Sequence, residues 1–424
     1  MRPYSRARSR NAAIRNLGLG IMASLSMVLA ACGGTTATPT PASANPTAAP
    51  QAVATTAPAA TATTAPAAPT ATTAAAASPT TAPTVAPTTA PTEVATVAPT
   101  AAAAIQTKLT GAPVTLVVYS AQGYDDAMTK AFQKATGIPT KLVDDSTGPL
   151  LARIQAEKNN PQWGLIWVDG DEAFAAMDQQ GMLLKGYEPS VQWTEQGKAV
   201  VPKDQSYIPT GLTVAGTLVY DSKTVSDPPK TWQDLLDPKW KGQIGMNNPA
   251  VSGPTFPFVA GMMEYLGGET QGEDFYSTLK ANGLHTYSTN GDTLHALETG
   301  QIKLAMIQSS AGIGADLKVP TIKTAFIPKV SLLPSVIGID AKAPAQEQTE
   351  AKMFAEFVLS PAGQEVMLNG DKTGDSLYWP VIQGVQPQSV LPALDSVPTQ
   401  VLDPYVWGAK ESEINKWFSD NIVQ

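Results

Sequence analysis

Short apolar runs alternate with longer amphipathic segments between residues 114 and 181. Three of these runs predict buried strands, at residues 114–119, 140–143 and 164–168. Helical periodicity follows each strand, at residues 125–136, 149–158 and 171–180, and Gly137 and Gly181 end the first and third of these helices. This order predicts open α/β layers, in which small-molecule sites lie at the carboxyl ends of the strands.

Small hydroxyl residues and glycines stand where the predicted strands pass into helices, and the pattern returns at residues 252–255 and 309–312. Helix N-termini present free backbone N–H groups, which suit a carboxylate, phosphate or phosphonate. We therefore expect nine residues to line one cleft: Ser120, Gln122, Ser146, Thr147, Asp169, Ser252, Thr255, Ser309 and Ser310. Each loop taken singly is equally consistent with an ordinary helix cap or turn.

The N-terminus combines five arginines, from Arg2 to Arg15, with an apolar stretch at residues 17–31 that is short for a membrane span. This pattern predicts a secretory signal over residues 1–31. The sequence Leu-Ala-Ala-Cys that ends at Cys32 resembles the bacterial lipoprotein signal, and Cys32 is the only cysteine of the chain. The resemblance implies cleavage before Cys32 and lipid on its thiol. An ordinary secretory signal is the alternative.

Residues 33–107 consist almost entirely of Ala, Thr and Pro, with twelve prolines and a single charge at Glu93. Such a segment buries too little apolar area to offset its chain entropy. We expect residues 32–107 to form a disordered tether between the lipidated cysteine and a folded part. The threonine-rich composition also suits O-linked glycans.

Residues 108–424 carry mixed apolar and polar patterning and are long enough for two lobes. Their net charge is −12, which argues against nucleic acid as a partner. Because Cys32 lies outside this part, it has no disulfide, thiolate metal site or cysteine nucleophile. We expect no cofactor and no resident metal.

Five segments in order resemble the solute-binding proteins of ABC importers, which have the type 2 periplasmic-binding fold. These segments are residues 114–122, 131–138, 235–245, 291–302 and 350–364. The third reads Leu-Leu-Asp-Pro-Lys-Trp-Lys-Gly-Gln-Ile-Gly, and the last two are similar to the subgroup that contains ferric-iron and aminoethylphosphonate binders.

The resemblance implies two α/β lobes joined by a two-crossing hinge, closing around one ligand that is delivered to a membrane permease. We expect the crossings at residues 213–218 and 325–330. The first lobe would comprise residues 112–212 and 331–424, and the second residues 219–324. The resemblance also places the loop at residues 378–380 near the mouth of the cleft.

The chain differs from the iron binders of the subgroup at the positions that would hold the ligand. Iron binders of the subgroup place a histidine after the glutamine of the first strand, a carboxylate after the third strand, and adjacent tyrosines after a later strand. Here these places hold Gly123, Asp169, and Ser310 with Ala311. Ferric iron requires hard anionic donors, so the neutral donors predict an oxyanion instead. A cation such as a polyamine, held by Asp144, Asp145 and Asp169 with Trp167 as a platform, stays open.

Catalysis is the rival class, because three short strings reproduce the motifs of penicillin-recognising serine enzymes: residues 277–280, 372–374 and 419–421. Their order is wrong, since Ser-Asp-Asn belongs between the other two. We expect no catalysis, although a surface hydrolase and a sensory receptor remain alternatives. The prediction is a lipid-anchored, extracytoplasmic, monomeric receptor for a small, anionic solute.

Overall fold

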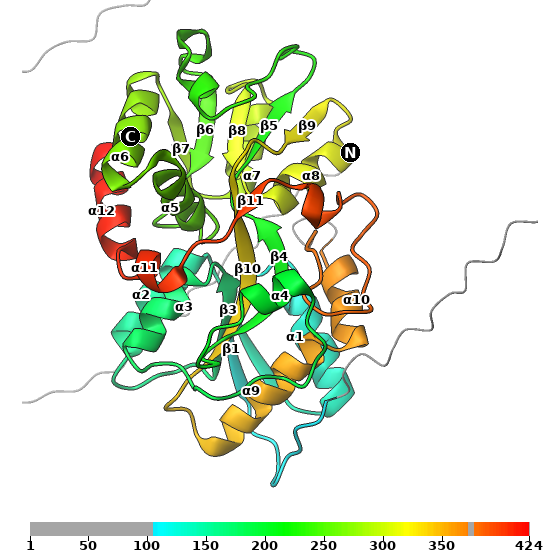
Figure 1. Cartoon of the computed structure of the whole chain (residues 1–424). Helices are drawn as coiled ribbons and strands as arrows, with labels where there is room; N and C mark the ends of the chain where they lie inside the picture. The colour runs from blue at the N-terminus through cyan, green and yellow to red at the C-terminus, as the bar shows by residue number, and fades with distance from the viewer. Residues whose placement is uncertain (1–104, 372–376, 424) are drawn as a thin grey trace, which may run out of the picture. The chain divides into compact units, whose positions relative to one another are not determined.

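The computed structural model describes residues 105–371 and 377–423 (Figure 1). These residues belong to one compact unit. The predicted signal peptide, Cys32 and the tether up to residue 104 lie outside the described residues, as does the Lys-Thr-Gly string at residues 372–374.

One sheet runs in the order β11-β10-β3-β1-β2, and β4 pairs with β10. Its strands are β1 (Leu116–Ser120), β2 (Thr140–Asp144), β3 (Leu165–Asp169), β4 (Ile208–Val214), β10 (Val330–Ile339) and β11 (Thr399–Gln400). β1 pairs in parallel with both β2 and β3, whereas β10 runs antiparallel to β3 and β4. The carboxyl ends of β1, β2 and β3 therefore meet at one edge. We call this sheet with its helices the first lobe.

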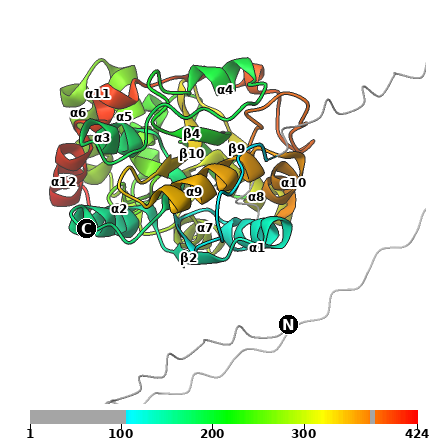
Figure 2. The ribbon, with the colours of Figure 1, turned by 90° about the horizontal axis from the view of Figure 1, so that it is seen from below.

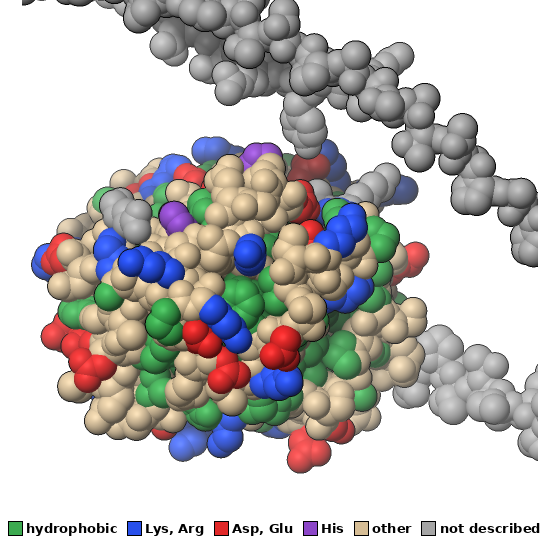
Figure 3. Space-filling view, turned by 90° about the horizontal axis from the view of Figure 1, so that it is seen from above, with side chains coloured by type: hydrophobic (Ala, Val, Ile, Leu, Met, Phe, Trp, Pro, Cys, Tyr) green, Lys and Arg blue, Asp and Glu red, His purple; other side chains and the backbone are tan. Residues whose placement is uncertain are grey.

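The second sheet runs in the order β7-β6-β8-β5-β9. Its strands are β5 (Thr217–Asp221), β6 (Ile244–Asn247), β7 (His285–Tyr287), β8 (Leu304–Ile307) and β9 (Ile322–Ala325). We call this sheet with its helices the second lobe. On its outer end, lysines and acidic side chains are interspersed (Figure 3).

Helices cover both sheets. Those of the first lobe are α1 (Asp125–Thr136), α2 (Thr147–Glu157), α3 (Glu172–Gln179), α4 (Glu195–Ala199), α9 (Ala345–Val358) and α10 (Pro361–Asn369). Figure 2 shows α9 lying across this lobe, with α1, α2 and α10 around it. The second lobe has α5 (Thr255–Leu266), α6 (Glu269–Ala281), α7 (Asn290–Glu298) and α8 (Ser309–Lys318). The strands and helices predicted between residues 114 and 181 are all present, with ends shifted by one or two residues.

Two connections pass between the sheets. β4 is followed directly by β5 through residues 215 and 216, and β9 by β10 through residues 326–329. Both lie within the crossings expected from the sequence. The division of the chain into lobes at the predicted boundaries stays a prediction.

The C-terminal helices contact both lobes. α11 (Pro404–Gly408) packs on α3 so closely that a Cβ at Gly408 would lie 2.1 Å from the backbone oxygen of Glu172. α12 (Glu411–Asn421) packs on α6, where the rings of Phe418 and Tyr276 have centroids 5.3 Å apart. Residues assigned from the sequence to the first lobe therefore include a helix that rests on the second.

Trp167 lies in the core of the first lobe and is fully buried. Its ring packs edge-on against Tyr124 and Phe354, and its indole Nε1 lies 3.1 Å from the hydroxyls of Thr210 and Ser335. The suggested role of Trp167 as a platform for a cationic ligand is therefore wrong, because its side chain is fully buried in the core.

The first described residues are attached to α9. The backbone N–H groups of Gln106 and Thr107 donate to Oε2 of Glu356 at 2.8 and 2.9 Å, and the Thr107 hydroxyl donates to Oε1 at 2.7 Å. Tyr187 supplies a further hydrogen bond to this buried carboxylate at 2.9 Å. The folded part thus includes at least two residues that the sequence assigned to the tether.

Candidate ligand cleft

The two lobes touch where α2 begins. The backbone N–H of Gly148 donates to the carbonyl of Val251 in the second lobe at 3.1 Å. A Cβ at Gly148 would lie 2.1 Å from the backbone oxygen of Ala250, so only glycine permits this approach. Beside it, Thr147 packs against Gly253. The lobes are therefore closed on one another at this edge.

A polar cleft of about 170 Å³ lies next to this contact. From the first lobe it is lined by Ala121, Gly123, Ser146, Thr147, Asp169 and Tyr378. From the second lobe it is lined by Ser252, Gly253, Pro254, Ser288, Thr289, Asn290, Gly291 and Gln308. The cleft is small, and its walls come from both lobes.

Helix N-termini converge on the cleft. The N-cap residues of α2, α7 and α8 are Ser146, Thr289 and Gln308, respectively. The side chains of Ser146 and Gln308 make no capping hydrogen bond. The Thr289 hydroxyl instead accepts from the N–H of Asp292 at 3.1 Å. Each of these N-termini carries partial positive charge, and none of the described lining residues of the cleft is basic.

Asp169 is the only charged residue among the described residues that line the cleft. Its Oδ1 accepts from Gln122 Nε2, and its Oδ2 accepts from Gln308 Nε2 and the Tyr378 hydroxyl, each at 2.8 Å. Burial raises the pKa of Asp169, and these hydrogen bonds act in the opposite direction. Since Gln308 comes from the second lobe, Asp169 also joins the two lobes.

Asn247, at the end of β6, positions two lining residues of the second lobe. Its Nδ2 donates to the hydroxyl of Ser252 at 3.2 Å and to Oδ1 of Asn290 at 2.7 Å. Its Oδ1 in turn accepts from the Thr293 hydroxyl at 2.6 Å. This buried network fixes the loops that follow β6 and β7 against each other.

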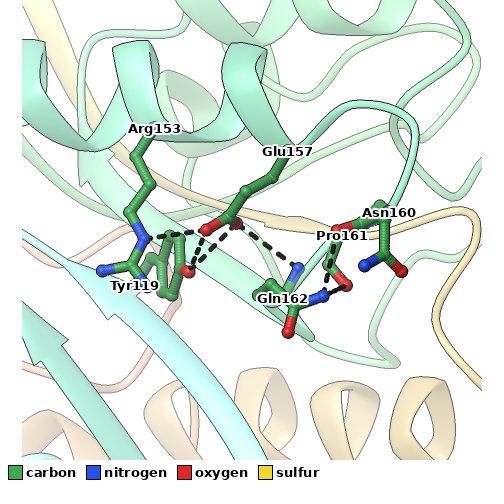
Figure 4. Close-up of polar contacts among 6 residues, drawn as sticks. All are labelled: Tyr119, Arg153, Glu157, Asn160, Pro161 and Gln162. Carbon is green, nitrogen blue, oxygen red and sulfur yellow. Dashed lines mark hydrogen bonds and ion pairs between the residues drawn. The ribbon is translucent and has the colours of Figure 1, made fainter. Parts of the chain in front are cut away.

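Arg153 is the only arginine after residue 15, and it lies away from the cleft on α2. Figure 4 shows its Nε pairing with Oε1 of Glu157 at 2.9 Å, while the Tyr119 hydroxyl donates to Oε2 of Glu157 at 3.0 Å. The guanidinium also stands over the Tyr119 ring, 4.8 Å from its centroid. These contacts tie α2 to β1, so that the N-terminus of α2 is held at the cleft.

Four of the nine residues predicted from the sequence line the cleft: Ser146, Thr147, Asp169 and Ser252. The other five, which are Ser120, Gln122, Thr255, Ser309 and Ser310, are buried outside the lining. The Ser120 hydroxyl accepts from the N–H of Gln122 at 3.1 Å, and that of Ser309 accepts from the N–H of Val214 at 3.2 Å. These hydroxyls satisfy buried backbone N–H groups.

Sequence reasoning missed Ser288, Thr289, Asn290, Gly291, Gln308 and Tyr378. The first four form a Ser-Thr-Asn-Gly loop between a strand and a helix, so the rule applied to the other loops would have found them. Gln308 directly follows β8, and the sequence pattern points instead to the serines at the next two positions. No local pattern marks Tyr378, and only the family resemblance placed its loop near the cleft.

The three aspartates suggested as the site of a cationic ligand do not come together at the cleft. Asp144 and Asp145 are exposed and do not line the cleft, so Asp169 is the only one of the three there. Residues 105–371 and 377–423 contain no group of three His, Cys, Asp or Glu able to hold a metal ion. The strings at residues 277–280 and 419–421 lie within α6 and α12, and none of their residues lines the cleft.

Residues 127–398 of this chain match a family model described as bacterial extracellular solute-binding protein. The chain belongs to this family. The solute-binding protein is 24% identical over 275 residues to a Salmonella typhimurium protein with the provisional name 2-aminoethylphosphonate-binding periplasmic protein, a match covering 62% of this chain and 78% of the relative. It is also 26% identical over 316 residues to a Sinorhizobium fredii protein provisionally named ABC transporter periplasmic-binding protein y4fP. This match covers 72% of this chain and 84% of the relative.

Solved structures show the same fold. The periplasmic binding protein AfuA of Actinobacillus pleuropneumoniae, with fructose-6-phosphate bound, superposes with a TM-score of 0.65 at 20% identity and covers 73% of this chain and 98% of its own. Iron-bound HitA of Pseudomonas aeruginosa superposes with a TM-score of 0.61 at 22% identity. This match covers 72% of this chain and 99% of HitA. The solute-binding protein therefore has the two-lobed α/β fold of type 2 periplasmic binding proteins. Within its described ranges, no helix has the length and apolarity needed to cross a membrane.

Proposed function

We propose that this solute-binding protein captures a small ligand bearing an oxyanion, a phosphonate, phosphate ester or carboxylate, and delivers it to the permease of an ABC importer. The supporting observation is a polar cleft between the lobes where three helix N-termini meet and no described lining residue is basic. Backbone N–H groups and hydroxyls then hold the anion without an arginine or lysine. The names of two relatives, one as a 2-aminoethylphosphonate-binding protein and one as an ABC transporter binding protein, support both parts of this proposal.

Asp169 adds a requirement to the ligand. A carboxylate beside a bare anion repels it, whereas a ligand that carries a donor beside its oxyanion satisfies both groups. An aminophosphonate such as 2-aminoethylphosphonate has this pairing, with the phosphonate at the helix N-termini and the ammonium near Asp169. The volume of about 170 Å³ also favours a ligand of few atoms over a sugar phosphate.

The protein would act as a monomer outside the cytoplasm, anchored by lipid on Cys32. The Ala/Thr/Pro composition of residues 33–104 supports a tether that separates the lobes from the membrane surface. Lipidation and anchoring rest on the sequence alone.

Calorimetry with four probes tests the ligand class: 2-aminoethylphosphonate, methylphosphonate, putrescine and ferric citrate. We expect 2-aminoethylphosphonate to bind most tightly and methylphosphonate more weakly, because the latter leaves Asp169 without a partner in the ligand. Tight binding of putrescine alone, or of ferric citrate alone, would overturn the anionic class.

Two variants test the site. Ser146→Ala and Ser252→Ala remove lining hydroxyls and should each weaken phosphonate binding by roughly 1–3 kcal/mol, the usual cost of losing a hydrogen bond to a charged group. Ser277→Ala, on the exposed surface of α6, is the matched control and should leave affinity unchanged. Unchanged affinity in both lining variants would remove the cleft as the site.

A further inference from the structure

A second and larger cavity, of about 690 Å³, lies on the other side of the contact between Thr147 and Gly253. Both residues line the cleft and this cavity, so the closing contact of the lobes separates the two spaces. Its walls come from α2, α3, residues 249–253 of the second lobe, and the start of α12. A volume of several hundred Å³ is typical of small-molecule sites.

One wall of the cavity is apolar. It is formed by Leu151, Ala152, Ala173, Ala176, Met177 and Ala250. Gln155, Gln179, Gln180 and Ser412 add neutral polar groups, and none of the described lining residues is basic. The space therefore suits an organic body more than a bare ion.

Glu411 carries the only charge in this described lining. No hydrogen bond or ion pair reaches its carboxylate from residues 105–371 or 377–423. One turn further along α12, Asn415 also lines this cavity, and its Oδ1 is buried without a hydrogen-bond partner in the described chain. Glu411 and Asn415 thus bring acceptors that have no partner among the described residues to this end of the cavity.

We propose that this cavity binds a small organic amine, with its apolar body against the alanine and leucine wall and its ammonium on Glu411 and Asn415. An ammonium supplies three donors and one positive charge, which are what the acceptors lack. A metal ion fits less well, because the described residues hold no cluster of three acidic or histidine ligands. This site is separate from the proposed oxyanion cleft and does not rest on the identity of the ligand there.

Amine binding should also favour closure of the lobes. α2 and α3 belong to the first lobe, whereas α12 is fixed to the second through Phe418 and through Lys280 Nζ, which donates to the carbonyl of Ile422 at 2.7 Å. The cavity is therefore complete only when the lobes meet. A ligand that binds only the closed form shifts the equilibrium toward it and raises the affinity of any other ligand that needs closure.

The test uses the full chain with benzylamine, and with benzyl alcohol as its uncharged counterpart, followed by calorimetry. We expect benzylamine to bind with one-to-one stoichiometry and at least tenfold more tightly than benzyl alcohol. Glu411→Gln should weaken benzylamine tenfold or more. The matched control Glu413→Gln, an exposed glutamate on the same helix, should leave binding unchanged.

A second variant, Ala176→Phe, fills the cavity without touching the acceptors and should also reduce benzylamine binding at least tenfold. Circular dichroism and the thermal midpoint of each variant show whether it folds. Benzylamine should still bind when 2-aminoethylphosphonate is saturating. Direct competition between them, or equal benzylamine affinity in wild type and Glu411→Gln, would overturn the amine site. Amine binding in a protein that ignores every phosphonate would overturn the proposed function alone.

Discussion

Asp125 and Glu411 are acidic side chains whose ionised forms are disfavoured by loss of water. Burial raises the pKa of Asp125 to about 6, with a smaller contribution from the charge of Asp144, and raises the pKa of Glu411 to about 7. In the unfolded chain the corresponding values are 3.8 and 4.5. The folded protein therefore binds more protons than the unfolded chain between about pH 4 and pH 7.

We expect the free energy of unfolding to fall as the pH rises from 4.5 to 7.5. Asp125→Asn removes one source of this dependence and should recover stability on the order of 1–3 kcal/mol at pH 7.5. Urea denaturation at several pH values measures both effects. Asp227→Asn, which changes an exposed carboxylate paired with Lys230, is the control. A stability that rises over this range would contradict the prediction.

At the scale of single residues, the sequence indicates which loops reach the cleft but not which way each side chain turns. Ser146 and Ser309 follow the same rule, since each lies where a strand gives way to a helix. Ser146 faces the cleft, whereas Ser309 turns inward because the N–H of Val214 needs an acceptor. That demand comes from a strand 95 positions away in the chain, which no local pattern reveals.

At the scale of elements, local periodicity was enough for β1 to α3, because each strand or helix is marked by its own residues. β10 shows the limit. It is fully buried, pairs with both β3 and β4, and contains Pro334, so its place depends on partners from distant parts of the chain. The packing of α12 on α6 is likewise set by tertiary contacts such as that of Phe418 with Tyr276.

The segment before β1 gives a testable boundary. A chain beginning at Ile105 should keep the stability of the folded part, whereas one beginning at Lys108 should lose about 1–3 kcal/mol, because Glu356 then loses three donors. Thermal denaturation of the two chains measures the difference. In a Glu356→Gln background the two chains should differ less. Equal stability in the unmutated background would mean that these residues contribute nothing to the fold.

At the scale of the whole molecule, closure depends on Gly148. Gly148→Ala places a methyl group against the carbonyl of Ala250 in the second lobe, so the substitution penalises the closed arrangement while each lobe stays intact. We expect affinity for the cleft ligand to fall at least tenfold, a cost of about 1.4 kcal/mol or more. X-ray scattering should show a larger radius of gyration.

Gly111→Ala, where a Cβ would approach only Gln346 at 3.9 Å, is the control for this experiment. It should change neither affinity nor radius. If Gly148→Ala binds the ligand as tightly as the unmutated protein, the contact at residue 148 has no part in closure.

Attachment to the membrane is also a property of the whole chain. If Cys32 carries lipid, Cys32→Ser should release the protein from the membrane fraction, because the acyl chains provide the anchor. Fractionation of cells followed by immunoblotting measures this. Ser78→Ala, in the same tether, should leave the protein membrane-bound. Retention of the Cys32→Ser variant on membranes would contradict lipid anchoring.

The hydrogen bond between Gly148 and Val251 joins backbone to backbone, and so it is indifferent to the side chains around the cleft. Substitutions at Ser146, Ser252 or Asn290 would therefore change the lining of the cleft one residue at a time and leave this contact between the lobes in place. A duplicated gene would keep the closing contact while the residues that line its cleft changed. The ligand preference of such a protein could then change in small steps, and at each step the two lobes would still close.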